Sequence, residues 1–163
     1  MRLSPSNRTG ILPRRLVGAI ALSAGLAIAP GVFAEDAPLV VAHNMVNAWN
    51  DLDADAIAEL FAEDGTFQSM MMDEGLQGRE AMREHFTRLL AGATMLKLEL
   101  RNIVESNGSV FLERVDYFTY KGKEGSLPVA AVLDIKDGKV SAWREYYDRA
   151  ALLQEMGIAE GEH

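Results

Sequence analysis

Two dipeptides in the C-terminal half, Asn107-Gly108 and Asp137-Gly138, constrain the fold of this chain more than any other feature. Both central residues of a type I′ turn need a positive φ angle, which Asn, Asp and Gly adopt most readily, so each dipeptide predicts a tight β-hairpin. The residues around them have β character, with a further turn at 122–125. We therefore expect an antiparallel meander of four strands, over residues 96–105, 110–120, 127–136 and 140–147.

The part of the sequence before these strands has helical spacing, because apolar residues recur every three or four positions. Asp53 is placed to cap the second of the helices, and we expect a brief strand over residues 66–70. We predict helices over residues 39–49, from Asp53 to Asp64-Gly65 and over 78–90, then a helical turn or two at 150–156 and a frayed end at 157–163. Helices followed by a meander indicate an α+β roll, in which a curved sheet wraps one long helix and leaves a hollow at its open end.

The first 34 residues have the composition of a signal peptide. Four arginines precede an apolar run over residues 16–28, and the small side chain of Ala34 suits a signal peptidase. The run is short for a bilayer, so cleavage after Ala34 is favoured over an uncleaved membrane anchor. Arg14-Arg15 leaves a twin-arginine export route open beside the general one. We expect residues 1–34 to be removed and residues 35–163 to form a single periplasmic or secreted domain without membrane contact.

Composition excludes several classes of function. Removal of the four leader arginines leaves 12 basic against 24 acidic residues, and such a surface repels nucleic acid. The chain has no cysteine, which excludes a disulfide, a thiol nucleophile and a lipoprotein anchor. Its three histidines, His43, His85 and His163, are scattered without the spacing of metal ligands. Glycine-rich phosphate loops and a Gly-x-Ser-x-Gly motif are also missing, so we expect neither metal nor cofactor.

Three charged residues stand in rows that also contain large apolar side chains, and for the strand over 140–147 neither face is obviously the core. Period-two alternation over 110–120 places Arg114 and Asp116 in one row with Val110, Leu112, Phe118 and Tyr120. Opposite charges are costly to bury unless they pair, so this pair indicates either a structural bridge or a site. The same alternation over 140–147 groups Trp143, Glu145 and Tyr147 on one side and Val140, Ala142, Arg144 and Tyr146 on the other. If the first group looks inward, Glu145 can join Arg114 and Asp116.

The stretches NGSVFLERVD at 107–116 and DGKVSAWREYYD at 137–148 resemble the limonene-1,2-epoxide hydrolase family of the nuclear-transport-factor-2-like (NTF2-like), or SnoaL-like, superfamily. LFAED at 60–64 and GREA at 78–81 fit its earlier segments, so the likeness covers about residues 38–156. The resemblance implies a cone-shaped roll of three N-terminal helices packed on a curved, mostly antiparallel sheet. It also implies a homodimer that binds a small apolar molecule.

The resemblance further implies roles for residues. Asp116 corresponds to the base that deprotonates water, Arg114 to the bridge and Glu145 to the acid that protonates the oxygen of an epoxide. Glu145 stands where the family has aspartate, and Phe67 and Ser69 stand where it has the tyrosine and asparagine that hold the water. We expect Phe118, Leu127, Trp143 and Tyr147 as pocket walls, with Met70-Met71-Met72 at the mouth. The alternatives are an isomerase or cyclase and a non-catalytic carrier of apolar molecules.

Overall fold

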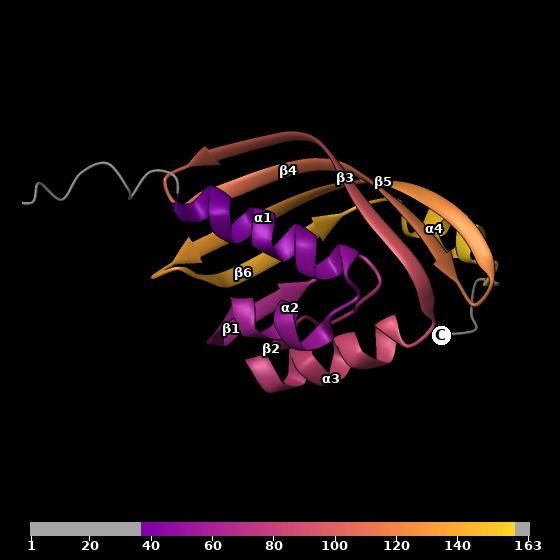
Figure 1. Cartoon of the computed structure of the whole chain (residues 1–163), viewed down its shortest axis with the longest axis horizontal. Coiled ribbons are helices and arrows are strands. Elements are labelled where there is room, and N and C mark those ends of the chain that lie inside the picture. Colours follow the sequence, from indigo (N-terminus) through magenta and orange to yellow (C-terminus); the bar gives the residue numbers. More distant parts are fainter. Residues whose placement is uncertain (1–36, 159–163) are drawn as a thin grey trace, which may run out of the picture. The chain divides into compact units, whose positions relative to one another are not determined.

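The computed structural model describes residues 37–158, and the predicted signal peptide and the last five residues lie outside this range (Figure 1). The elements are α1 (Ala37–Asn50), α2 (Ala54–Leu60), β1 (Phe61–Gln68), β2 (Leu76–Gln77), α3 (Arg79–Leu90), β3 (Ala93–Ser106), β4 (Ser109–Tyr120), β5 (Lys123–Lys136), β6 (Lys139–Tyr146) and α4 (Arg149–Met156). The predicted order, helices before a meander, is confirmed. None of the helices within 37–158 is long and apolar enough to cross a bilayer.

The sheet has six strands in the order β2-β1-β6-β5-β4-β3. Only β1 and β6 run parallel, and every other neighbouring pair is antiparallel. Three two-residue turns join the last four strands, and both residues of each turn have positive φ, as in Asn107-Gly108 and Asp137-Gly138. The third turn is Lys121-Gly122, and β5 begins directly after it at Lys123. The turn predicted at 122–125 is therefore shorter than expected and begins one residue earlier.

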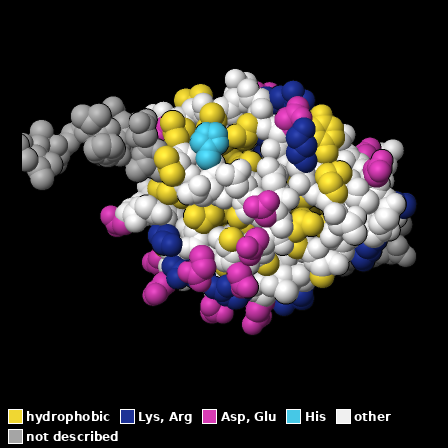
Figure 2. Space-filling view, in the orientation of Figure 1, with side chains coloured by type: hydrophobic (Ala, Val, Ile, Leu, Met, Phe, Trp, Pro, Cys, Tyr) yellow, Lys and Arg dark blue, Asp and Glu magenta, His cyan; other side chains and the backbone are white. Residues whose placement is uncertain are grey.

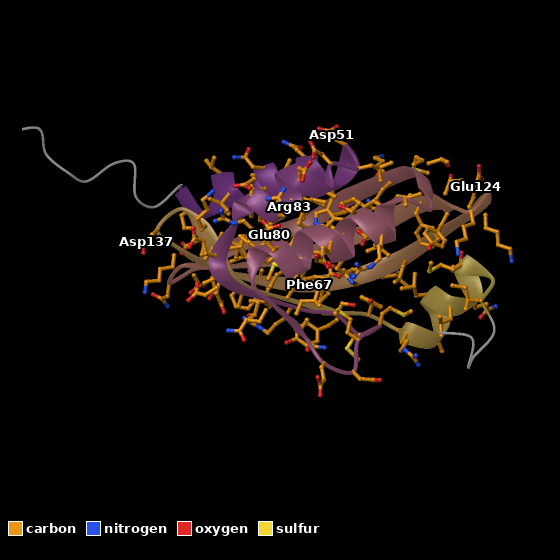
Figure 3. The ribbon with its side chains drawn as sticks, turned by 90° about the horizontal axis from the view of Figure 1, so that it is seen from below. Asp51, Phe67, Glu80, Arg83, Glu124 and Asp137 are labelled. Atoms are coloured by element: carbon orange, nitrogen blue, oxygen red, sulfur yellow. The ribbon has the colours of Figure 1, made fainter. Side chains whose placement is uncertain are left out.

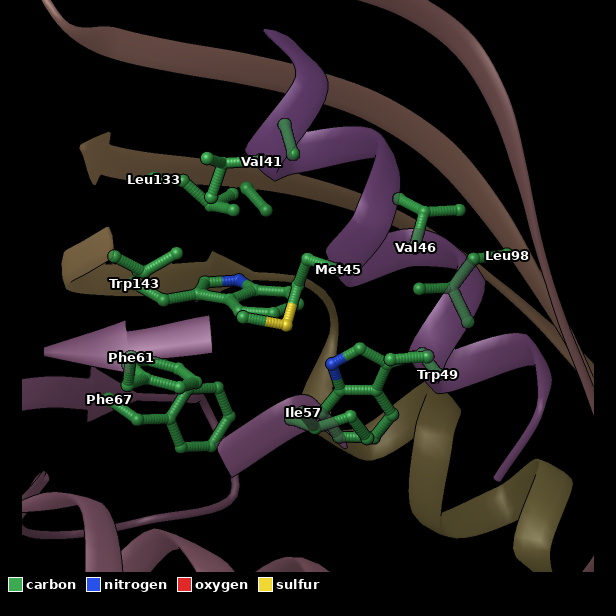
Figure 4. Packing of buried hydrophobic residues seen from close by; sticks show 14 of the residues in the cluster. Val41, Met45, Val46, Trp49, Ile57, Phe61, Phe67, Leu98, Leu133 and Trp143 are labelled. Carbon is green, nitrogen blue, oxygen red and sulfur yellow. The ribbon is translucent and has the colours of Figure 1, made fainter. Parts of the chain in front are cut away.

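The helices cover one face of this sheet, and the core lies between them. Figure 1 shows α1 lying across the long strands, with α2 and α3 beside β1 and α4 at the other end near β5. Six apolar side chains of α1 are buried in the core, which is why its helical spacing is so regular: Val41, Ala42, Met45, Val46, Ala48 and Trp49. Figure 4 shows Val41, Met45, Val46 and Trp49 among them. Burial of each large apolar side chain contributes about 1.5–3 kcal/mol.

Aromatic rings fill the centre of the core. Trp49 meets Phe86 and Trp143 edge to face, with ring centroids 5.1 and 5.9 Å apart, and Phe67 makes the same kind of contact with Trp143 at 5.9 Å. Phe61 stacks on Trp143 at 6.2 Å. Aromatic pairs in these geometries stabilise the fold beyond the contribution of burying their apolar surface. The cluster joins α1, α3, β1 and β6 (Figure 4).

The boundary between α2 and β1 differs from the prediction. Asp53 caps α2 as expected, because its carboxylate accepts a hydrogen bond from the Ala56 N–H at 2.9 Å. The helix ends at Leu60, however, and Phe61 is extended, with φ −79° and ψ 151°. The prediction that this helix reaches Asp64-Gly65 is wrong. An extended Phe61 pairs with Val140 of β6 and places its ring in the core, which a further helical turn would not do.

Ion pairs hold the outer sides of α2 and α3 together. Arg83 of α3 bonds the carboxylates of Asp55 and Glu59 on α2, and lies 3.4 Å from Glu80 on its own helix (Figure 3). Figure 2 shows acidic and basic side chains mixed over this part of the surface. Exposed pairs of this kind each contribute little, so we regard the cluster as structural.

Strand β6 contains a bulge that changes which residues face inward. Ile135 pairs with Val140 and Asp134 with Ala142, which leaves Ser141 unpaired. Val140 and Trp143 are therefore both buried, although strict alternation places them on opposite sides. The predicted grouping of Val140 with Arg144 and Tyr146 is wrong for Val140. Trp143, Glu145 and Tyr147 do share the inward side, as the first of the two predicted groups.

A fourth helix completes the fold at the predicted tail. Asp148 caps α4 by accepting the Ala151 N–H at 3.0 Å, and Gly157 ends it with φ 66°. Leu153 is buried, and Leu152 and Met156 pack with Phe118, Leu127 and Val129 in a second, smaller apolar cluster. The helical turn or two predicted at 150–156 is confirmed.

Candidate active site

Strand β4 holds Arg114 and Asp116 two residues apart on its inward face. Arg114 Nε donates to Asp116 Oδ1 at 2.7 Å, and Arg114 Nη2 donates to Asp116 Oδ2 at 3.1 Å. Two parallel bonds of this kind form the strong, bidentate arrangement of a guanidinium and an ionised carboxylate. Arg114 is only 3% exposed, whereas Asp116 keeps part of its surface open. The alternation of the sequence predicted this pairing.

Glu145 reaches the same guanidinium from β6. Arg114 Nη2 donates to Glu145 Oε1 at 2.5 Å, across the intervening strand β5. The residue of β5 directly opposite Glu145 is Ala131, whose small side chain leaves room for the arginine to pass over it. The guanidinium also lies 5.8 Å from the ring centre of Trp143, which favours a cation over its face. One buried cation thus joins two carboxyl groups from two strands.

Burial and neighbouring charges shift the pKa values of Arg114 and Glu145. Burial alone would lower the pKa of Arg114, but the two carboxylates outweigh it and keep the guanidinium charged. Burial raises the pKa of Glu145 above its ordinary value, and the negative charge of Asp116 raises it further, against the attraction of Arg114. The environment of Glu145 therefore favours the protonated form of its carboxyl group.

These residues lie in the wall of a pocket of about 370 Å³. Its other walls are mostly apolar and come from α3, α4 and the inward faces of β3, β4 and β5, with Leu89, Leu96, Phe118, Leu127, Val129, Leu152 and Met156 among them. A largely apolar pocket with a few convergent polar groups is the usual form of a small-molecule site. Among residues 37–158, no three His, Asp or Glu side chains gather as metal ligands would.

A pair of hydroxyl groups adds further polarity to the pocket. Ser69 Oγ and the Tyr147 hydroxyl are 2.9 Å apart, and Ser69 Oγ accepts the Met71 N–H at 3.2 Å. Ser69 follows β1 and Tyr147 follows β6, so the bond closes the gap between two chain segments. Burial raises the pKa of Tyr147 to about 12, so this phenol keeps its proton at any ordinary pH.

The structure brings together eight of the nine predicted site residues. Arg114, Asp116, Glu145, Phe67, Ser69, Phe118, Leu127 and Tyr147 all line the pocket. Trp143 is the correction: it is 0% exposed and lies in the aromatic core behind Arg114 rather than in the pocket wall. Phe67, at 2% exposure, also packs mainly against the rings of Phe86 and Trp143. At the predicted mouth Met71 and Met72 line the pocket, while Met70 is exposed.

Several pocket residues were not predicted from the sequence. His85 lines the pocket from α3, with its ring centre 6.3 Å from that of Phe67, and burial together with the charge of Arg88 lowers its pKa. Leu152 and Met156 line it from α4. Their spacing gave a signal, because His85 lies between Met82 and Leu89 on one helix face and Leu152 and Met156 are four residues apart.

Comparison with known protein families matches most of the described chain to one family model. The model of the SnoaL-like domain matches residues 42–143, which spans all elements from α1 to the middle of β6. The match includes Arg114 and Asp116 and ends two residues before Glu145.

Solved structures of several proteins are similar over most of this chain. A protein with a ketosteroid isomerase-like fold from Catenulispora acidiphila, solved with trimethylamine, is 21% identical, with a TM-score of 0.67, over 73% of this chain and 93% of that one. An LEH-like epoxide hydrolase from M. tuberculosis is 16% identical, with a TM-score of 0.66, over 75% and 90%. A candidate SnoaL-like polyketide cyclase from Shewanella denitrificans is 11% identical, with a TM-score of 0.66, over 74% and 96%.

At these identities the likeness concerns the fold. It confirms the predicted NTF2-like α+β fold, with N-terminal helices on a mostly antiparallel sheet. The structure adds that this sheet has six strands and one parallel pair. Proteins of this fold include enzymes of different chemistry as well as proteins without a known function. The activity of this chain therefore has to be argued from its own site.

Proposed function

We propose that the pocket of this chain, which belongs to the SnoaL-like domain family, is an active site. In this site, water is added to a small apolar epoxide. The observation that carries this proposal is the contact of Arg114 with both Asp116 and Glu145 in the wall of a mostly apolar pocket. An epoxide needs a base and an acid at once, because water is a poor nucleophile and an alkoxide is a poor leaving group. Two carboxyl groups held by one cation can supply both.

The two carboxyl groups have different environments, and these support different roles. Asp116 accepts both parallel N–H bonds of Arg114, as an ionised carboxylate does, and is the proposed base. Glu145 is buried, its pKa is raised, and it is the proposed acid. Arg114 fixes the distance between them and keeps both in one network.

The reaction follows from these roles. Asp116 takes a proton from water while the water oxygen forms a bond to an epoxide carbon. The bond from that carbon to the ring oxygen breaks, its electron pair stays on the oxygen, and Glu145 gives this oxygen a proton. The product is a diol, with Asp116 protonated and Glu145 ionised. A proton then returns from Asp116 to Glu145, directly or through solvent, before the next turnover.

A panel of terpene, styrene and alicyclic epoxides tests the proposal. We expect the purified protein to convert at least one of them to its diol, and Asp116→Asn to lower the rate by about 100-fold or more. Circular dichroism of the variant controls for folding. If no epoxide yields a diol, or if Asp116→Asn leaves the rate unchanged, the proposal fails.

Phe67 favours a second candidate. Its ring presents no hydroxyl to a water molecule, and it packs against Trp143 and Phe86 in the wall of the pocket. A drier pocket suits an isomerase or cyclase, in which Asp116 would remove a proton next to a carbonyl group. Deuterium exchange into ketones without addition of water would favour this candidate, and ligand binding without either reaction would favour a carrier.

Export and assembly complete the proposal. Cleavage after Ala34 would deliver the domain of residues 35–163 to the periplasm or the medium, and we propose that it acts there as a homodimer on a small apolar molecule. Mass spectrometry of the exported protein should give an N-terminus at Glu35. Light scattering should give twice the mass of the mature chain.

A further inference from the structure

The hydroxyl pair of Ser69 and Tyr147 has one O–H donor more than the hydrogen bond between the two groups uses. The pair contains two O–H hydrogens, and only one of them can lie in the 2.9 Å bond between the two oxygens. The Met71 N–H donates to Ser69 Oγ, so this bond occupies a lone pair of the oxygen and leaves both O–H hydrogens available. Whichever hydroxyl donates to the other, one O–H hydrogen is left for a third partner.

No described residue takes this hydrogen. Within residues 37–158, the hydrogen bonds of the two hydroxyl groups are those to each other and to the backbone of Met71. Ser69 is 5% exposed, and both residues line the pocket. An O–H group in an apolar pocket gains more from an acceptor than the same group in water, because few other partners compete.

The pair lies at the Glu145 end of the trio. Tyr147 follows Glu145 by two residues on the same side of the chain. In the parallel register of β1 and β6, Phe67 pairs with Trp143, so Ser69 and Glu145, each two residues further on, come to neighbouring positions. Glu145 and Arg114 line the same pocket as the two hydroxyl groups.

We propose that Ser69 and Tyr147 form a donor site for an oxygen atom of the ligand, the same oxygen that exchanges a proton with Glu145. In catalysis, which rests on the proposed hydrolase function, this is the epoxide oxygen. The spare O–H hydrogen then bonds that oxygen as its negative charge grows, before the proton of Glu145 arrives. The proposed ligand is therefore an apolar molecule with one acceptor oxygen, such as an epoxide or a ketone.

Both hydroxyl groups must be removed to test this site. Loss of Tyr147 alone frees the O–H of Ser69, and loss of Ser69 alone frees that of Tyr147. The test variant is therefore Ser69→Ala with Tyr147→Phe. A matched control carries the same chemical changes at exposed positions, Ser126→Ala with Tyr146→Phe, where Ser126 takes part only through its backbone N–H.

Binding of 2-decalone and of decalin, the hydrocarbon with the same skeleton, provides the first readout by titration in NMR. One hydrogen bond predicts that the test variant binds the ketone about 3- to 10-fold more weakly, whereas the hydrocarbon binds unchanged. Unchanged hydrocarbon binding also shows that the pocket is intact. If the test variant and the control bind the ketone equally well, the proposal is overturned.

Kinetics provide the second readout. On an epoxide that the protein converts to a diol, we expect the test variant to lower kcat by about 100-fold with a much smaller change in KM. A diol-forming protein whose test variant keeps its kcat would overturn the inference but not the hydrolase. A protein that forms no diol but loses its preference for the ketone in the test variant would overturn the hydrolase and support the donor site.

Discussion

Arg114 and Glu145 meet across a whole strand: they are 31 positions apart in the sequence, yet Arg114 Nη2 and Glu145 Oε1 are 2.5 Å apart over β5. Asp116 holds the other edge of the guanidinium, so the cation is fixed from two sides. Removal of Arg114 leaves Asp116 and Glu145 without their cation in a buried place. Replacement of a member of this trio should therefore change both the stability and the activity of the protein.

Arg114→Met should destabilise the fold by about 3–5 kcal/mol, because it leaves two carboxyl groups facing each other without their cation. Urea unfolding followed by fluorescence measures this change. Adding Asp116→Asn and Glu145→Gln to the same chain should recover most of the loss, since no charge is then left unpaired. If the triple variant is less stable than Arg114→Met, mutual repulsion is not the cause.

The stability of the protein should depend on pH through Glu145. Folding raises the pKa of Glu145 above its ordinary value of 4.5, chiefly through burial. The folded state then keeps a proton that the unfolded chain has released, so the stabilisation is complete below pH 4.5 and is lost as the pH rises through the raised value. The free energy of unfolding of the wild type should fall over this range relative to that of Glu145→Gln. Parallel curves would contradict the shift.

Glu145→Gln should abolish most diol formation, because an amide keeps the shape of the side chain but has no acidic proton to give. We expect a loss of about 100-fold or more. Glu145→Asp keeps the carboxyl group but shortens the side chain by one methylene, so we expect a rate between those of the wild type and Glu145→Gln. Steady-state rates on one epoxide compare the three proteins, and equal rates would remove Glu145 from the mechanism.

Phe67→Tyr should distinguish a hydrolase from a carrier. The change adds one hydroxyl at a ring that lines the pocket, at the cost of about 1–3 kcal/mol if that hydroxyl finds no partner. A hydrolase with a poorly held water should gain in rate, whereas a carrier should gain nothing. Diol formation per folded molecule, with the folded fraction taken from thermal unfolding, is the measurement.

Local patterns predicted most of the fold. Asn107-Gly108 and Asp137-Gly138 form the expected turns, and the helical spacing before residue 92 gives α1 and α3 with small errors at their ends. The end of α2 was missed because the residues after Leu60 are compatible with a helix, and only the core position of Phe61 makes them extended. Long-range packing therefore decided that boundary.

The site was predicted in part for a related reason. A charged pair on an apolar strand face stands out in a sequence, so Arg114 and Asp116 could be found from alternation alone. Trp143 was placed in the pocket wall because core and pocket share one face of the sheet, and residue type does not separate them. His85 and the α4 residues were missed because only the folded chain brings α3 and α4 to the same hollow.

The unpaired Ser141 has a consequence for the sign of the charge in the pocket. Its hydroxyl donates to the Asp134 carbonyl at 3.0 Å, and on the outer face Asp134 also accepts Arg144 Nη1 at 2.7 Å. A perfectly regular ladder counted from the hairpin would turn Arg144 toward Arg114 and Glu145 toward the solvent. The one extra residue, Ser141, thus decides whether the Arg114 guanidinium meets the carboxyl group of Glu145 or the second guanidinium of Arg144.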